Sequence, residues 1–163
     1  MIIVKKNSYL KYKNFRYRCA IGKAGIKKKL REGDNITPKG TYKLINIFYR
    51  PDRIEELKTH IKKIKITKKM GWCDDVNSKY YNRQIELPCK LKHEKLYRKD
   101  SLYDIIGVLS YNINPIIRNK GSAIFLHIAK KNYQKTKGCI AIKKIHLIKL
   151  LSIIGKNTKI KIE

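Results

Sequence analysis

The chain has 163 residues and is strongly basic, with 40 Lys and Arg against 12 Asp and Glu and a formal net charge of +28. Hydrophobic residues make up 42% of the sequence, which is enough to build the core of one domain over residues 1–163 and excludes a disordered chain. No apolar run reaches the roughly 20 residues that span a bilayer, so the sequence predicts no transmembrane segment.

The N-terminal third predicts β structure. Apolar and polar residues alternate in four segments, residues 2–4, 9–12, 15–21 and 42–49. Such alternation, broken by Gly, Pro and Asn, is typical of antiparallel strands joined by turns. Residues 51–101 show little periodicity beyond a possible strand at 61–66, and we interpret them as a long irregular insertion that lies over the sheet.

The C-terminal third predicts core strands and one helix. Apolar runs at 102–109 and 123–129 indicate buried strands, and the start of the first run also suits a short helix. Residues 142–154 place apolar side chains near helical spacing and stop before a glycine, which predicts a helix. Alternating Lys and Ile at 158–162 predict a closing strand. The expected fold is therefore mainly β with one C-terminal α-helix.

The cysteines favour neither disulfides nor a metal site. The chain has four of them: Cys19, Cys73, Cys89 and Cys139. No two have the spacing of a zinc motif, and nothing at the N-terminus resembles an export signal, because the apolar residues 1–4 give way at once to Lys5 and Lys6. We therefore expect free thiols, no metal and no cofactor.

The positive charge does not by itself predict a nucleic-acid-binding protein. Lysines are scattered along the whole chain, and no zinc-finger, RNP or GXXG motif is present. We favour drift of surface positions to Lys in an AT-rich genome, with no specific nucleic acid as partner. A basic surface still attracts polyanions, including carboxylate-rich polymers.

The strongest chemical signal is a His and a Cys twelve residues apart. His127 ends an apolar run, and Cys139 follows Gly138 shortly before the predicted helix. A thiol at a helix N-terminus is favoured as thiolate, and a nearby imidazole can take its proton. Gly138 would let the backbone turn so that its own amide and that of Cys139 form an oxyanion hole. Both residue types are also common in cores, so the pair alone is weak evidence.

The surrounding residues resemble a known family. Residues 121–127 followed by 136–142 are similar to the active-site signature of the YkuD-type L,D-transpeptidases, in which a His precedes an (S/T)-x-G-C motif. Residues 31–42 resemble the upstream G-D-x-x-T-P-x-G-x-[FY] segment of the family. Residues 71–75, 81–83 and 93–95 resemble a bacterial branch of it, so the resemblance spans about residues 15–155.

The resemblance implies an antiparallel β-sandwich or barrel that acts on peptidoglycan stem peptides. It makes Cys139 the nucleophile, His127 the base and Gly138 part of the oxyanion hole. Two positions differ from the family pattern: Lys137 replaces a His that many members carry, and Ala141 stands where Asn or Arg is usual. We expect Lys137 to lower the thiol pKa or to bind a substrate carboxylate.

Other residues have competing interpretations. Trp72, the only Trp, is a packing anchor under the insertion or a substrate platform. Tyr111 and Asn112 follow a buried strand, so they line the substrate cleft or belong to a loop. Asp34 and Thr37 lie in the matching upstream segment, and we assign them a structural role as turn formers.

The expected reaction is acyl transfer through a Cys139 thioester. An amine acceptor would give a 3-3 cross-link, whereas water would make the protein an L,D-carboxypeptidase that trims tetrapeptides. The non-enzymatic alternative is a basic protein that binds nucleic acid or a wall polymer. The resemblance implies the cell envelope or periplasm, but the missing export signal leaves a cytoplasmic role open, and the sequence does not indicate an oligomeric state.

Overall fold

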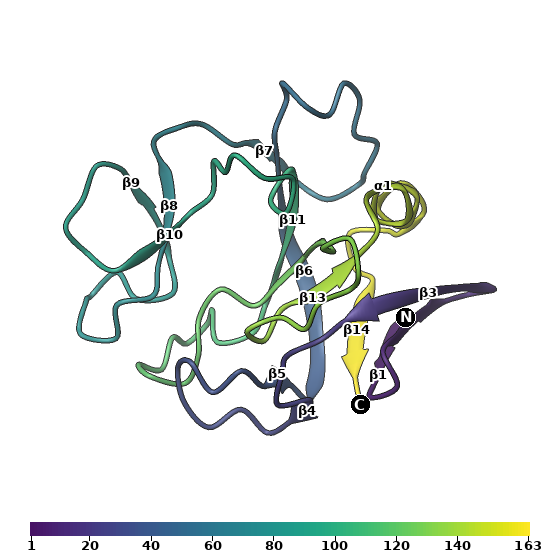
Figure 1. The fold of residues 1–163 in the computed structure, drawn as a ribbon, viewed down its shortest axis with the longest axis horizontal. Coiled ribbons are helices and arrows are strands. Elements are labelled where there is room, and N and C mark those ends of the chain that lie inside the picture. Colours follow the sequence, from purple (N-terminus) through teal and green to yellow (C-terminus); the bar gives the residue numbers. More distant parts are fainter.

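The computed structural model describes all of residues 1–163 (Figure 1). In chain order its elements are β1 (Ile2–Lys5), β2 (Tyr9–Tyr12), β3 (Phe15–Ala20), β4 (Ile26–Lys27), β5 (Thr37–Pro38), β6 (Gly40–Tyr49), β7 (Lys63–Lys65), β8 (Met70–Cys73), β9 (Gln84–Glu86), β10 (His93–Lys95), β11 (Ile105–Leu109), β12 (Phe125–Ile128), β13 (Ile140–Ile142), α1 (Lys144–Ile153) and β14 (Lys159–Ile162). No helix has the length and apolar character needed to span a membrane.

Eight strands close into a barrel. Their order is β11-β12-β13-β3-β2-β1-β14-β6, and β6 pairs back with β11, while β7 adds to the side of β6. The mainly β prediction is confirmed, as are the strands expected near β1, β2, β3, β6, β11, β12 and β14. The barrel is mixed rather than purely antiparallel, because β1 pairs with β14, and β12 with β13, in parallel.

Three further sequence predictions need correction. Residues 51–101 are not wholly irregular, because β8, β9 and β10 form a three-stranded antiparallel sheet, which stands to the left of the barrel in Figure 1. The helix starts at Lys144 rather than at 142, since Ile142 still belongs to β13 and pairs with Cys19. Residues 102–104 form no helix and lead directly into β11.

The barrel wall separates two apolar clusters. In β12, Leu126 and Ile128 point into the main core of the barrel, whereas Phe125 points outward into a second cluster beneath the insertion. All five residues of β11 are buried, because its inner face meets the main core and its outer face meets the second cluster. Period-two alternation therefore leaves His127 on the outer face of the wall.

The helix α1 closes one side of the main core. Leu147, Leu150 and Leu151 are fully buried and join the apolar residues of the barrel interior. Their i, i+3, i+4 spacing forms the single apolar stripe that a surface helix needs for packing.

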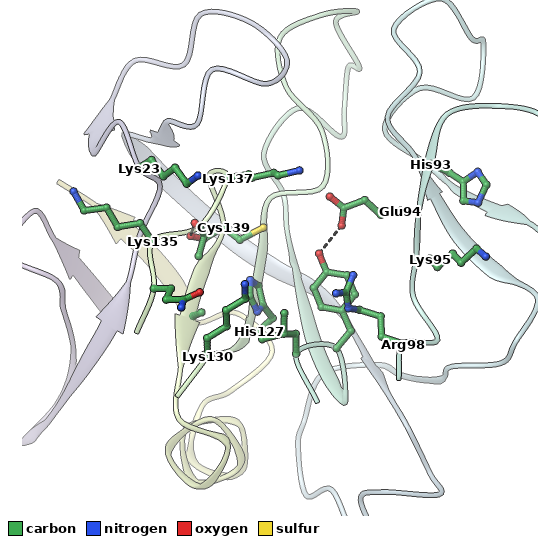
Figure 2. A pocket seen from close by; sticks show the side chains of 15 residues that line it. Lys23, His93, Glu94, Lys95, Arg98, His127, Lys130, Lys135, Lys137 and Cys139 are labelled. Carbon is green, nitrogen blue, oxygen red and sulfur yellow. Dashed lines mark hydrogen bonds between the residues drawn. The ribbon is translucent and has the colours of Figure 1, made fainter. Parts of the chain in front are cut away.

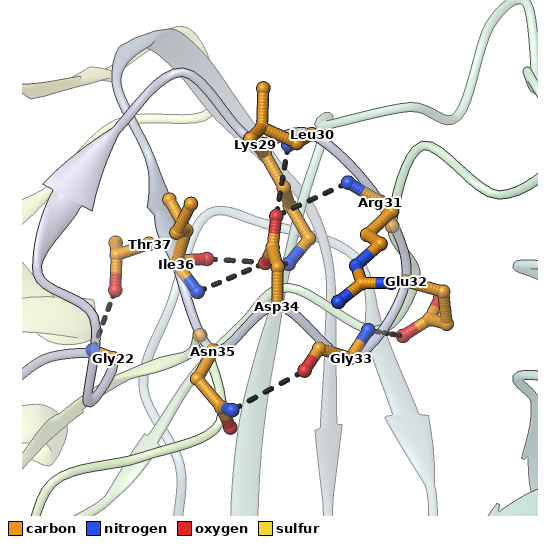
Figure 3. A network of polar contacts seen from close by, with 12 residues as sticks. Gly22, Lys29, Leu30, Arg31, Glu32, Gly33, Asp34, Asn35, Ile36 and Thr37 are labelled. Carbon is orange, nitrogen blue, oxygen red and sulfur yellow. Dashed lines mark hydrogen bonds and ion pairs between the residues drawn. The ribbon is translucent and has the colours of Figure 1, made fainter.

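The loop between β4 and β5 is built around a buried ion pair (Figure 3). Asp34 pairs with Lys29 at 2.5 Å, and both side chains are almost inaccessible to solvent. The carboxylate also accepts hydrogen bonds from the backbone N–H groups of Leu30, Arg31 and Ile36. Burial raises the pKa of Asp34, but the Lys29 and backbone hydrogen bonds outweigh it and lower the pKa to about 2. Asp34 therefore has the structural role expected from the sequence.

Substituting Asp34→Ala is expected to lower the free energy of unfolding by about 3 kcal/mol, because it leaves the Lys29 ammonium buried without an anionic partner. Denaturant titration measures the loss. Because the pKa of Asp34 is lowered, its stabilisation is complete above its ordinary pKa of 3.8 and disappears as the pH falls through about 2.

The matched control is Glu56→Ala, which removes an exposed ion pair with Lys58. It should change the free energy of unfolding by less than about 0.5 kcal/mol. Equal losses for the two variants would contradict the structural role of Asp34.

Candidate active site

The parallel pairing of β12 with β13 brings His127 and Cys139 together. Leu126 lies opposite Ile140 and His127 opposite Ala141 in this ladder. Cys139 directly precedes β13, so the same register places it level with Phe125, two residues before His127 along the adjacent strand. Side chains two residues apart share a face, and both residues line the same cavity on the outer side of the barrel.

This cavity is large and basic, with a volume of about 1110 Å³ (Figure 2). The barrel supplies His127 and Cys139, whereas the insertion supplies the opposite wall through residues 93–95 of β10. Six cationic side chains line it: Lys23, Lys95, Arg98, Lys130, Lys135 and Lys137. Glu94 is the single carboxylate in the lining. The field of this cavity therefore attracts anionic ligands.

The backbone fixes the tautomer of His127. Its Nδ1 donates a hydrogen bond to the carbonyl oxygen of Ile128 at 2.9 Å, so Nε2 carries the free lone pair. The ring packs edge-on against Tyr103, with 5.4 Å between the ring centroids. Burial lowers the pKa of His127 to about 4. The imidazole is thus neutral near pH 7 and able to accept a proton.

The thiol of Cys139 is also uncharged at rest. It donates to the carbonyl oxygen of Ala123 at 3.1 Å and accepts the N–H of Phe125 at 3.3 Å. Burial raises its pKa to about 12, and the negative charge of Glu94 adds to this increase. The expectation that Cys139 lies at the N-terminus of the helix is therefore wrong, because β13 follows it directly. Of the two roles expected for Lys137, lowering of the thiol pKa does not agree with the raised pKa of Cys139.

A compact turn holds the residues before Cys139. The hydroxyl of Thr136 donates to the carbonyl oxygen of Cys139 at 2.6 Å and accepts the N–H of Gly138 at 3.1 Å. The N–H of Gly138 is therefore occupied, while that of Cys139 donates to no protein group. The amide of Cys139 is the one available to an oxyanion.

Gly138 is required by both conformation and space. Its φ is +138°, and a Cβ at this position would lie 2.9 Å from the carbonyl oxygen of Ile36. Ile36 belongs to the loop organised by Asp34, and the hydroxyl of Thr37, the first residue of β5, accepts the N–H of Gly22 at 2.8 Å. The upstream segment of the family pattern thus packs directly against the turn that carries Cys139.

A buried amide supports the thiol from the other side. Asn82 Oδ1 accepts the N–H of Ala123 and the indole N–H of Trp72, each at 3.0 Å. Ala123 adopts a positive φ of 52° and supplies the carbonyl that accepts the Cys139 thiol. Trp72 is buried edge-on against Phe125, with 5.2 Å between ring centroids, so it is a packing anchor and does not line the cavity.

Tyr111 and Asn112 also lie outside the cavity lining. The Tyr111 hydroxyl donates to the carbonyl oxygen of Lys120, and the Asn112 side-chain amide donates to the carbonyl oxygens of Ile117 and Gly121. Both residues close the loop that leads into β12. They therefore follow the loop interpretation, whereas Lys137 lies at the cavity as expected.

The sequence interpretation assigned no role to three residues that shape the site: Asn82, Glu94 and Thr136. All three lie in segments that resemble the family pattern, so their positions carried a signal. The role of Asn82 depends on Ala123, 41 residues along the chain, and that of Glu94 on the opposite wall of the cavity. The role of Thr136 depends on turn geometry, and none of these features appears in a local pattern.

In the free protein, alkylation of Cys139 by iodoacetamide should accelerate continuously from about pH 7 to about pH 10, because a pKa of about 12 leaves the thiolate population rising throughout. Peptide mapping by mass spectrometry measures the rate at this cysteine. In guanidinium-unfolded chain the rate should level off near the ordinary pKa of 9.0. A plateau below that value in the folded protein would show that Cys139 is a thiolate at rest.

Comparison with known families agrees with this geometry. A family model described as YkuD, the L,D-transpeptidase catalytic domain, matches residues 1–162. A comparison with proteins of curated function finds no match to the chain. The family match covers the barrel, the insertion and both walls of the cavity, and the chain belongs to the YkuD family of L,D-transpeptidase catalytic domains.

Proposed function

We propose that the protein transfers an acyl group of a peptidoglycan stem peptide through a thioester on Cys139. Family membership suggests L,D-transpeptidase-type activity on peptidoglycan. The observation that carries the proposal is one cavity that holds the Cys139 thiol, the basic Nε2 of His127 and a cationic lining. A Cys and a neutral imidazole are the minimum pair for nucleophilic acyl transfer.

In the acylation step, Nε2 of His127 removes the thiol proton as Cys139 attacks the carbonyl of the third stem residue. The N–H of Cys139 is free to stabilise the oxyanion that forms. The protonated His127 then gives its proton to the nitrogen of the terminal D-alanine, which leaves, and the thioester remains. Because both groups start neutral, charge separation occurs only when substrate fills the cavity.

The cationic lining favours a donor that carries several carboxylates. A stem peptide ending in D-alanine presents its terminal carboxylate close to the bond that is cleaved. Lys137 neighbours the nucleophile in sequence and lines the same cavity, so it is suited to hold that carboxylate. Such a contact would orient the scissile carbonyl toward Cys139.

The fate of the thioester defines the reaction. Attack by the amine of a second stem peptide gives a direct 3-3 cross-link, and we favour this outcome on family grounds. Attack by water gives an L,D-carboxypeptidase, the alternative. Cross-linking requires the cell envelope, and we propose that location for the protein.

Replacing Cys139 with Ala should abolish D-alanine release from disaccharide tetrapeptide while preserving the fold, because the small side chain adds no clash beside Gly138. Liquid chromatography with mass spectrometry measures the products, and circular dichroism checks the fold. Cys19→Ala, Cys73→Ala and Cys89→Ala should stay active, because none of these cysteines lines the cavity. D-alanine release by Cys139→Ala at the parent rate would remove Cys139 from the mechanism. No release by the parent or the variant, with polymer binding that falls steeply with salt, would support the non-catalytic alternative.

His127 should titrate near pH 4, below its ordinary pKa of 6.5, because burial disfavours the imidazolium. NMR titration of the imidazole Cε1–H signals measures this value, and His127→Gln assigns the signal. Protonation of His127 should consequently not slow donor cleavage until the pH falls below about 5. A His127 pKa at or above 6.5 would contradict the neutral resting pair.

A further inference from the structure

We infer that Glu94 forms a binding site for a primary ammonium group, the acceptor amine of the transfer reaction. This inference rests on the proposed function for its biological meaning. It concerns the step in which the acceptor amine attacks the thioester. Cys139 and His127 provide no group that binds this amine. An amine competes with water at a thioester only if it is held in place.

The surroundings of Glu94 are unusual for a carboxylate. Its side chain is partly buried, and Oε2 accepts a hydrogen bond from the hydroxyl of Tyr103. Six cationic side chains line the same cavity, yet Glu94 forms an ion pair with none of them. Arg98 is instead held by Asp100 through hydrogen bonds of 2.8 and 2.6 Å.

The second oxygen of Glu94 is open to a ligand. Oε1 accepts no hydrogen bond from the protein, and it is not among the side-chain atoms that are buried without a partner. In Figure 2 the carboxylate points from β10 into the cavity toward the wall that carries Cys139. Its charge also reaches the nucleophile, since Glu94 contributes to the raised pKa of Cys139. A cation bound here would therefore lie in the same cavity as the reacting thioester.

The charge of the rest of the cavity makes this position selective. Six cations repel an approaching ammonium, and Glu94 is the single lining group that attracts one. Partial burial removes water from a carboxylate, and this loss of hydration costs free energy when no ion pair replaces the water. An ammonium bound to Glu94 would offset that cost. The cationic groups can meanwhile hold the carboxylates of the same acceptor peptide. The cavity thus suits a ligand with an ammonium and one or more carboxylates.

The protons of the transfer step balance with these groups. The ammonium gives one proton to Glu94, and burial, which raises the pKa of this carboxyl, makes it a better acceptor. The free amine then attacks the thioester carbonyl, the C–N bond forms and the C–S bond breaks. A second proton passes from nitrogen through His127 to the departing sulfur of Cys139. The amide keeps the third proton, and Glu94 releases its own to solvent.

The first test compares Glu94→Gln with the parent. Each protein receives disaccharide tetrapeptide and a stem peptide that carries a free side-chain amine, and mass spectrometry gives the ratio of 3-3 dimer to tripeptide. This ratio should fall about tenfold in Glu94→Gln, because a neutral amide replaces a charged partner of the ammonium. The ratio is independent of how much protein is folded.

Glu86→Gln is the matched control. Glu86 lies in the same three-stranded sheet but is exposed and outside the cavity lining, so its substitution should leave the ratio unchanged. A ratio in Glu94→Gln within twofold of the parent would overturn the inference. A parent that yields tripeptide alone would overturn the acceptor role of the site.

The second test measures binding without turnover. NMR titration should show that the parent binds 6-aminohexanoate more tightly than hexanoate. The ratio of the two dissociation constants should be about tenfold smaller in Glu94→Gln. Equal binding of the two probes by the parent overturns the ammonium site. A preference for 6-aminohexanoate in a parent that forms no thioester supports the site and overturns the proposed function, so the two failures are distinguishable.

Discussion

The register between β12 and β13 is the constraint on which the site depends. Because side chains alternate across a strand, a slip of one residue would turn His127 or Cys139 into the barrel and expose an apolar neighbour. Leu126, Ile128, Ile140 and Ile142 prevent such a slip, since all four are buried in the main core. The same apolar packing that closes the barrel therefore aligns the imidazole with the thiol.

Two loops far apart in sequence then complete the alignment. The loop organised by Asp34 supports Gly138 from one side, and Asn82 supports Ala123 from the other. Between them the Cys139 sulfur is held by backbone groups rather than by a charged partner. This arrangement explains how a cavity so rich in lysine can contain an uncharged thiol: burial outweighs the attraction that nearby cations exert on a thiolate.

Much of the fold and the central pair could be predicted from the sequence, because period-two alternation marks β1, β2, β3 and β6 directly. Of the three-residue strands, β7 falls within the possible strand expected at 61–66, whereas β9, β10 and β13 could not be predicted. β13 is too short to show a period, so its Ile142 was assigned to the helix, which placed Cys139 beside a helix N-terminus that lies further along the chain. The expected low thiol pKa followed from that placement.

Side-chain roles outside the pair were harder to predict, for a different reason. Trp72, Tyr111 and Asn112 have the chemistry of substrate-binding residues, but here their polar groups are used to hold loops. Glu94 is the reverse case. Its position between His93 and Lys95 in the sequence suggests an exposed surface residue, but it lines the cavity. In the folded protein Glu94 forms an ion pair with none of the six cationic side chains that line the cavity, a feature that a local sequence pattern does not show.

The neutral resting state of Cys139 also bears on chemical durability. Peroxides and disulfides react with thiolates, so a thiol whose pKa is raised to about 12 presents very little of the vulnerable form between turnovers. Its sulfur is occupied by the carbonyl of Ala123 and the amide of Phe125 as well. The burial that raises the pKa of Cys139 therefore also slows the reaction of its sulfur with oxidants.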